Sequence, residues 1–325
     1  MQTVAIVGCG VVGAMIAYEL SRCPDMAITV YDRQLPAQGS TGAALGVLMA
    51  AISHKVKGSG MHMRLDSIRR YDALIPELEA ITGRRIPYNR QGLLHLCFAR
   101  EELPVWERLA ALRQAQGWRL VMLDRAQLQT AYPYLDHPEL VAAVHSLDDR
   151  QVHPTELTLA LVAAAKQQGV QFQLGVTVHG IGAKGQMLTD QGSLSADWIV
   201  IAAGIGSSAL SQQAVDIRPV LGQALRLRLP TPLGTSALQP VVTGNDTHIV
   251  PLGNNEYWVG ATVEFPEVDS PDALPQANPG LLEQVRQQAI AFCPALATGE
   301  ILHQWSGLRP RPYGRSAPII ESLPH

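Results

Sequence analysis

Two apolar runs that end in glycine turns stand out in the hydrophobic pattern of the chain. The first, Val4–Val7, precedes Val11–Ser21, where small and apolar residues recur at helical spacing, and then a second apolar stretch, Ile28–Tyr31. The other run, Ala196–Gly204, lies far along the chain. Continuous apolar runs of this length are typical of strands buried on both faces of a parallel sheet. The N-terminus is therefore predicted to form a strand, a tight turn, a helix and a second strand.

Helical spacing and short strand-like runs divide the rest of the chain. Helices are predicted at Met61–Ala80, Glu101–Gln116, Pro154–Gln168 and Pro279–Phe292. Strands are predicted at Gly92–Phe98, Val141–Leu147, Val176–His179, Met187–Thr189, Arg218–Leu229, Pro240–Thr243, His248–Pro251, Tyr257–Val263 and Ile301–Arg309. Pro76 is expected to kink or break the first helix. The Ala-, Leu- and Met-rich segment after Gly46 is expected to be helical, and Glu267–Asn278 is expected to be a loop.

The order of these elements predicts the fold class and two interleaved domains. Parallel-type strands at the start and middle, with antiparallel-type strands between and after them, indicate an α/β protein (α+β overall). A Rossmann-like nucleotide domain is assigned to residues 1–84, 147–215 and 312–325. A discontinuous, mainly antiparallel sheet domain is assigned to residues 85–146 and 216–311. A chain of 325 residues is long enough for this arrangement.

Composition and charge exclude several classes of protein. Hydrophobic residues make up 47% of the chain and charged residues 16%, and the net charge is −3, so neither disorder nor binding to nucleic acid is expected. No run of about 20 apolar residues predicts a membrane span, and the absence of a basic leader predicts a cytoplasmic protein. The histidines lack metal-ligand spacing, so no metal site is expected. The four cysteines lack CxxC spacing and predict no disulfides: Cys9, Cys23, Cys97 and Cys293.

The first turn carries a dinucleotide-binding motif, Gly8-x-Gly10-x-x-Gly13. Gly8 permits the tight turn, Gly10 lets backbone N–H groups approach a pyrophosphate, and Gly13 lets the helix pack on the strand. Asp32 lies nineteen positions after Gly13, at the end of the second predicted strand, where its carboxylate can accept ribose hydroxyls. The carboxylate disfavours a 2′-phosphate and hence NADP. The motif alone does not separate NAD from FAD.

Two further segments favour FAD over NAD. Gly39–Ala44, with the hydroxyls of Ser40 and Thr41, follows the acidic residue closely, where an extended FAD needs hydroxyl donors and close backbone approach. The apolar strand Asp197–Ala203 ends in a glycine turn, as does the return strand beside the cofactor in flavoproteins. An ordinary core strand followed by a turn explains this second segment equally well.

Several motifs follow one another along almost the whole chain. They are VAIVGCGVVG…AYEL, GSTGAALGVL, DRQVHPTEL (Asp149–Leu157), ADWIVIAAG, RPVLGQALRL (Arg218–Leu227), THIVPLG…YWVGATVE (Thr247–Glu264) and WSGLRPRPYGRSAPII (Trp305–Ile320). In this order and spacing they resemble the D-amino-acid oxidase (DAO) family of FAD-dependent oxidoreductases, and within it the glycine oxidases of thiamine biosynthesis.

The resemblance implies a reaction and its substrates. A hydride passes from the α-carbon of a small amino acid or amine to flavin N5, the imine hydrolyses, and molecular oxygen reoxidises the flavin to give hydrogen peroxide. The arginine of the GLRP motif, here Arg309, is implied to pair with the substrate carboxylate. No cysteine lies within Ile301–Ile320, so non-covalent FAD is expected. The resemblance is also compatible with a homo-oligomer.

The residues assigned to FAD come from the motifs that match the family. They are Gly8, Gly10, Val11, Val12, Gly13, Asp32, Arg33, Ser40, Thr41, Ala44, Gly46, Val178, Ala203 and Gly204. The sequence departs from the family at His248, where a tyrosine near the substrate is usual. An imidazole there can bond a carboxylate and adds a proton-dependent charge, or the histidine has no role. Family members also continue beyond the segment that ends here at His325, which implies either a piece of a longer chain or weakened FAD binding.

Three other functions compete with the oxidase prediction. A dehydrogenase of the same family would oxidise a D-amino acid or sarcosine and pass electrons to a carrier. A NAD-dependent dehydrogenase would need only the Rossmann unit, and the segment around Ser40 and the apolar strand before Gly204 argue against it. A non-catalytic flavin- or nucleotide-binding protein would bind the cofactor without turnover.

Overall fold

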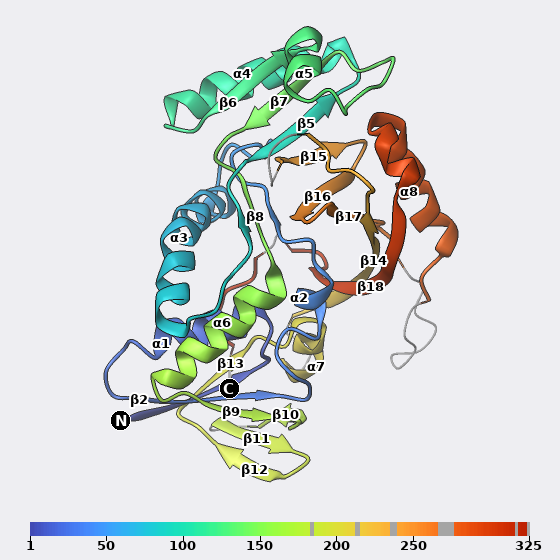
Figure 1. Cartoon of the computed structure of the whole chain (residues 1–325). Coiled ribbons are helices and arrows are strands. Elements are labelled where there is room, and N and C mark those ends of the chain that lie inside the picture. Colours follow the sequence, from blue (N-terminus) through green and yellow to red (C-terminus); the bar gives the residue numbers. More distant parts are fainter. Residues whose placement is uncertain (183–184, 212–214, 235–238, 266–275, 316–317, 324–325) are drawn as a thin grey trace.

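The computed structural model consists of a four-stranded parallel sheet with layers on both faces and a larger, mainly antiparallel sheet beside it (Figure 1). It describes residues 1–182, 185–211, 215–234, 239–265, 276–315 and 318–323. Most of the predicted loop Glu267–Asn278 lies outside these residues. Among the described helices, none is both long and apolar enough to cross a bilayer.

The parallel sheet has the order β13-β1-β2-β9 and begins with the predicted N-terminal unit. Its strands are β1 (Gln2–Val7), β2 (Met26–Asp32), β9 (Gln171–Leu174) and β13 (Trp198–Ile201). In β1, Val4 and Ile6 pack into one core cluster, whereas Ala5 and Val7 pack into another on the opposite face. Burial on both faces explains the unbroken apolar run, because a half-buried strand would alternate.

Helices α1 (Val11–Leu20), α6 (Pro154–Gln167) and α3 (Ser59–Thr82) form the layer over one face of this sheet (Figure 1). Of the two outcomes expected at Pro76, the break is wrong, because α3 continues through this residue, and the kink stays a prediction. Proline removes the N–H that would bond the carbonyl four residues earlier. That carbonyl, of Asp72, instead accepts a hydrogen bond from Arg90 at 3.2 Å.

A small antiparallel sheet and short helices form the layer over the other face of the parallel sheet (Figure 1). The sheet contains β10 (Val178–Ile181), β11 (Gln186–Thr189) and β12 (Gly192–Ser195). The chain returns through β13 to the 3₁₀ turn Gly204–Gly206 and to α7 (Ser207–Leu210). The apolar strand before Gly204 is therefore a central-sheet strand that pairs directly with β1.

The large sheet has the order β18-β14-β17-β16-β15-β5-β7-β6, with only the β15–β5 pair parallel. Its strands are β5 (Leu93–Cys97), β6 (Leu120–Asp124), β7 (Ala142–Ser146), β14 (Ile217–Arg228), β15 (Val241–Gly244), β16 (Thr247–Gly253), β17 (Glu256–Gly260) and β18 (Glu300–Pro312). Further helices are α4 (Leu103–Ala115), α5 (Arg125–Ala131) and α8 (Pro279–Phe292), with 3₁₀ turns η1 (Arg100–Glu102) and η4 (Pro294–Thr298). The predicted α/β fold with a second, mainly antiparallel sheet is confirmed; the domain boundaries remain a prediction.

The segment after Gly46 does not form the expected helix. Residues Val47–Leu48 form the short strand β3, which pairs with β8 (Arg150–Val152), and β8 also pairs with β4 (Tyr88–Asn89). The predicted helix was wrong because tertiary pairing overrides the helix propensity of alanine, leucine and methionine. The only helix in this region of the described chain is the single turn α2, Ser40–Ala43.

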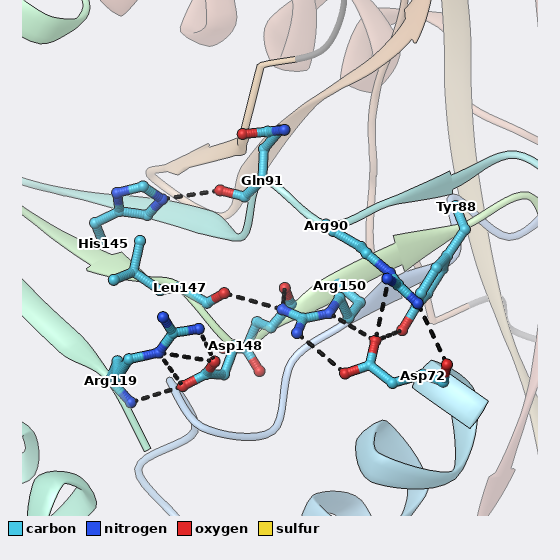
Figure 2. A network of polar contacts seen from close by, with 10 residues as sticks. Asp72, Tyr88, Arg90, Gln91, Arg119, His145, Leu147, Asp148 and Arg150 are labelled. Atoms are coloured by element: carbon cyan, nitrogen blue, oxygen red, sulfur yellow. Dashed lines mark hydrogen bonds and ion pairs between the residues drawn. The ribbon is translucent and has the colours of Figure 1, made fainter. Parts of the chain in front are cut away.

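Ion pairs join α3 to the strands that connect the two larger sheets (Figure 2). The Asp72 carboxylate accepts hydrogen bonds from Arg150 at 3.1 Å and from the Tyr88 hydroxyl at 2.9 Å. Burial alone would raise the pKa of Asp72, but the bonds from Arg150 and Tyr88 outweigh it and lower the pKa. This network fixes the strand that continues from Asp149 into α6.

Candidate functional site

The first glycine turn brings β1, α1 and β13 into close contact. A Cβ atom on Gly13 would lie 1.9 Å from the Gly8 carbonyl oxygen, and one on Gly8 would lie 2.3 Å from the Ala202 carbonyl oxygen. Gly8 also has φ +110°, which L side chains rarely adopt. Both positions therefore require glycine, as the motif predicts.

The N-terminus of α1 has unpaired backbone donors, and a hydroxyl lies beside it. Among the described residues, the N–H groups of Val12 and Gly13 have no hydrogen-bond acceptor. The N–H of Val11 donates to Oγ1 of Thr41 at 3.0 Å. Free N–H groups and the helix dipole form an anion-binding site. The geometry thus fits a dinucleotide pyrophosphate, and the exposed Val12 shows that the site is open to solvent.

The Asp32 carboxylate lies at the end of β2, next to the glycine turn. Its Oδ2 accepts a hydrogen bond from the N–H of Cys9 at 2.6 Å, and its Oδ1 accepts one from Gln34 at 2.8 Å. Because each carboxylate oxygen has a further lone pair, Asp32 can also accept from ribose hydroxyls. Cys9 was not predicted as a site residue, since its contribution comes from the backbone.

Helix α2 packs directly on β18 and so joins the two larger sheets at the site (Figure 1). The Ser40 hydroxyl donates to the Leu308 carbonyl at 2.6 Å, and the Trp305 indole donates to the Ala43 carbonyl at 3.0 Å. A Cβ on Gly307 would lie 2.2 Å from that of Ala43, so glycine permits this approach. The GST and GLRP segments, 268 residues apart at Ser40 and Leu308, are therefore neighbours.

The other predicted cofactor residues differ in how close they lie to this turn. Gly204 is next to Ser40, since a Cβ on Gly204 would lie 4.0 Å from the Ser40 hydroxyl. Ala203 and Val178 pack in the apolar cluster that also contains Val7. The rest lie along the strand ends: Ala44 follows α2, Gly46 bonds Val152 in β8, and Arg33 is exposed after β2.

Arg309 lies on β18 directly after Leu308, the residue whose carbonyl accepts from Ser40. Its Nη2 donates to the Thr262 carbonyl at 3.1 Å, and the guanidinium has no acidic partner among the described residues. A Cβ on Gly222 would lie 2.5 Å from Nη2, so glycine makes room for this side chain. Arg309 is exposed, yet desolvation by surrounding atoms lowers its pKa. An unpaired guanidinium suits a carboxylate ligand.

His248 lies on the same side of the large sheet as Arg309 and close enough to be affected by its charge. Its Nδ1 lies 2.8 Å from the Thr243 hydroxyl. Burial lowers the pKa of His248, the charge of Arg309 lowers it further, and Asp246 opposes both. The imidazole is therefore neutral at pH 7 and able to donate or accept a hydrogen bond.

Two other histidines near His248 were missed by the sequence analysis. His95 on β5 and His248 on β16 both lie opposite Thr243, and residues opposite one another in a sheet project from the same face. The ring centroids of His95 and Trp106 are 4.6 Å apart, and those of Trp106 and His54 are 4.3 Å apart. No local signal links these residues, which are far apart in the sequence.

Comparison of the sequence with models of known protein families identifies the family of this chain. The family model described as FAD dependent oxidoreductase (DAO) matches residues 3–325. The chain belongs to the DAO family. The predicted resemblance and the FAD cofactor are thereby confirmed, and a NAD-dependent dehydrogenase is excluded.

Individual relatives of this DAO-family chain are similar over nearly all of it. A bifunctional protein ThiO/ThiG from Synechocystis sp. is 34% identical over 321 residues, 95% of this chain and 46% of that protein. Glycine oxidase from Geobacillus kaustophilus is 28% identical over 315 residues, 95% of this chain and 81% of that protein. A crystal structure of glycine oxidase from Geobacillus kaustophilus matches with a TM-score of 0.85 and 27% identity, covering 96% of this chain and 84% of that chain. The chain spans about half the length of its bifunctional relatives.

Replacing Gly13 with alanine is expected to weaken FAD binding. The new Cβ would lie 1.9 Å from the Gly8 carbonyl, so α1 must move away from the turn that presents its N–H groups. Overpacking of this kind costs about 1–3 kcal/mol, which corresponds to roughly a 5- to 150-fold higher Kd for FAD. Fluorescence titration of the apoprotein with FAD measures this. Gly180→Ala on β10, where a Cβ meets nothing within 4 Å, is the control; equal affinities of the two variants would contradict the expectation.

Proposed function

We propose that this chain oxidises glycine or a similarly small amine-bearing acid. The amine would become an imine that hydrolyses to a 2-oxo acid and ammonia, while oxygen is reduced to hydrogen peroxide. The observation that carries the proposal is the position of Arg309, a guanidinium without an acidic partner among the described residues, one residue from the contact between β18 and Ser40. The names of the relatives, glycine oxidase and ThiO, support the same substrate class.

The residues of the glycine turn and of α2 would hold the cofactor. The bound FAD would supply the hydride acceptor and the route for electrons to oxygen. The N–H groups of Val12 and Gly13 would bind its pyrophosphate, and Asp32 would bind its ribose. Ser40 and Thr41 would extend this site toward β18, because their hydroxyls already bond Leu308 and Val11. We also propose that FAD binds non-covalently. In this proposal residues 1–84, 147–215 and 312–325 form the FAD-binding domain, and residues 85–146 and 216–311 form the substrate-binding domain.

The large sheet would bind and orient the substrate. Arg309 would bind the substrate carboxylate through the guanidinium N–H groups that do not donate to the Thr262 carbonyl. The bound carboxylate would then fix the orientation of the amine-bearing carbon. Neutral His248 would supply a hydrogen bond without adding charge. The amine must lose its proton to react, and no described side chain at Arg309 offers a carboxylate as base. Positioning rather than a dedicated side-chain base would then account for the chain's part in the reaction.

A visible absorption spectrum of the FAD-loaded chain tests the proposal. Anaerobic glycine is expected to bleach the flavin bands, and air is expected to restore them with one peroxide formed per glycine consumed. Bleaching that air does not reverse, but an artificial electron carrier does, would instead support the dehydrogenase of the same family. Flavin bands unchanged by glycine, sarcosine and D-alanine would contradict oxidation of small amines.

The charge state of His248 predicts a pH profile. A lowered pKa leaves the imidazole neutral above pH 6.5, its ordinary pKa, and its positive charge appears only as the pH falls further. His248→Gln, which retains a hydrogen-bonding side chain, is therefore expected to have a kcat/KM profile for glycine parallel to the parent profile between pH 6.5 and 8. The two profiles should diverge only at lower pH. A histidine-dependent inflection near pH 7 would show that His248 is charged at the site.

A further inference from the structure

Three side chains with metal-binding atoms meet where β5 passes under η1. His95, Cys97 and Glu102 each offer one ligand atom, and these atoms all lie within 4.8 Å of one another. His95 and Cys97 are two residues apart on β5, so the alternation of a strand places them on one face. Glu102 ends η1, the 3₁₀ turn that leads into α4. Two rigid elements therefore converge on one point.

These three side chains are not committed to other polar partners. None of them forms a side-chain hydrogen bond or ion pair with another described residue, and the ring contact of His95 with Trp106 leaves its nitrogens available. Cys97 is fully buried, whereas His95 and Glu102 are partly buried and provide a path from solvent. The ligand atoms of the three side chains are therefore free to bind an ion that reaches them from solvent.

The donor set selects a class of cation. An imidazole nitrogen, a sulfur and a carboxylate oxygen match the ligands of zinc, whereas magnesium and calcium prefer oxygen alone. A thiolate and a carboxylate would together balance a divalent charge. Three protein ligands leave the fourth tetrahedral position to water.

We propose that His95, Cys97 and Glu102 bind one zinc-class divalent cation per chain. The ion would tie η1, and hence the start of α4, to β5. Cys97 would bind as the thiolate, so each ion bound would release the thiol proton to solvent. The expectation of no metal site considered local spacing and missed this cluster.

Cobalt titration of the full, FAD-loaded chain tests the site, because Co²⁺ replaces Zn²⁺ and reports its ligands. One Co²⁺ per chain is expected, with d–d bands at wavelengths longer than flavin absorption and a thiolate-to-cobalt charge-transfer band in the difference spectrum. Stoichiometric Zn²⁺ should abolish these bands. Cys97→Ala should remove the charge-transfer band and weaken binding by roughly 100-fold. Glu102→Gln, a substitution outside the core, should weaken binding roughly tenfold and keep the band.

Two neighbouring substitutions are matched controls. Glu101 is exposed beside Glu102 but outside the cluster, and Cys23 is the exposed cysteine. Glu101→Gln and Cys23→Ser should bind cobalt as the parent chain does. Absence of a thiolate band in the parent chain, unchanged affinity in Glu102→Gln, or loss of the band in Cys23→Ser would overturn the proposal. Elemental analysis after dialysis against micromolar Zn²⁺ gives the stoichiometry independently of activity.

Discussion

Arg309→Ala is expected to raise KM for glycine by roughly 30- to 4,000-fold, while the flavin spectrum persists. Removal of a charged partner from a carboxylate costs about 2–5 kcal/mol, and each 1.4 kcal/mol corresponds to a factor of ten. FAD binding should survive, because the contact of this region with α2 uses the backbone carbonyl of Leu308 and not the arginine side chain. Steady-state peroxide formation over a range of glycine concentrations gives KM, and the visible spectrum reports the cofactor.

Arg311→Ala is the matched control for this prediction. Arg311 lies two residues further along β18 and is exposed. Its guanidinium carbon, Cζ, lies 5.6 Å from the centroid of the Phe265 ring. It carries the same charge without the contact to Thr262. Its substitution should change KM by less than about threefold, since exposed charges contribute little. A similar KM for the Arg309 and Arg311 variants would contradict the assignment of the substrate carboxylate to Arg309.

Asp149→Ala is expected to lower the free energy of unfolding by about 3–5 kcal/mol, because it removes the acceptor of several buried donors. The Asp149 carboxylate is fully buried and accepts from the N–H groups of Ala50 and Ala51 at Oδ1 and of Ile52 at Oδ2, at 2.7 to 2.9 Å. Its loss leaves three unpaired N–H groups in the interior. Urea unfolding of the FAD-loaded chain measures the change.

The buried Arg113 would lose its compensating charge in the same variant. Its guanidinium donates to the carbonyls of Ala51, Ser53 and Lys55 at 2.8 to 2.9 Å, so Asp149 and Arg113 hold one chain segment from two sides. Burial lowers the pKa of Arg113, and the charge of Asp149 opposes this effect. This segment leads from the GST region to His54, so its loosening should also raise the Kd for FAD.

Asp148→Ala provides a sequence-adjacent control for Asp149→Ala. Asp148 pairs with Arg119, whose side chain is 64% exposed, at the edge of the network in Figure 2. The Asp148 side chain is only 13% exposed and also accepts a hydrogen bond from the backbone N–H of Arg119 at 2.8 Å. This variant should therefore lose about 1–2 kcal/mol, less than the loss of the three buried bonds to Asp149. Equal destabilisation by the two substitutions would show that the three N–H bonds to Asp149 do not hold the segment.

Local sequence was sufficient for the nucleotide-binding unit. The strand, glycine turn, helix and acidic residue are contiguous, and each has its own signal: an apolar run, glycines where a Cβ would clash, and a carboxylate at the strand end. Helix α8 was likewise predicted with the bounds that the structure shows, Pro279–Phe292, because a proline begins it and apolar residues recur at helical spacing. The motifs also identified the family correctly.

Long-range pairing decided what these local signals left open. Composition predicted a helix where β3 pairs with β8, and Pro76 did not break α3, because Arg90 supplies a donor to the Asp72 carbonyl. Neither partner is visible in a window of a dozen residues, since each comes from elsewhere in the chain. Propensity is a weak prior that such tertiary contacts override.

The family, the glycine turn that we assign to FAD and the arginine that we assign to substrate could all be read from local motifs. The surroundings of that arginine became visible only in the folded chain: Thr262 and Gly222 lie beside its guanidinium, and His248 lies within reach of its charge. Folding also brought His95 and Cys97 to Glu102. The physical reason is that a turn motif depends on backbone conformation over a few residues, whereas a pocket depends on sheet register and on loops closed over hundreds of residues.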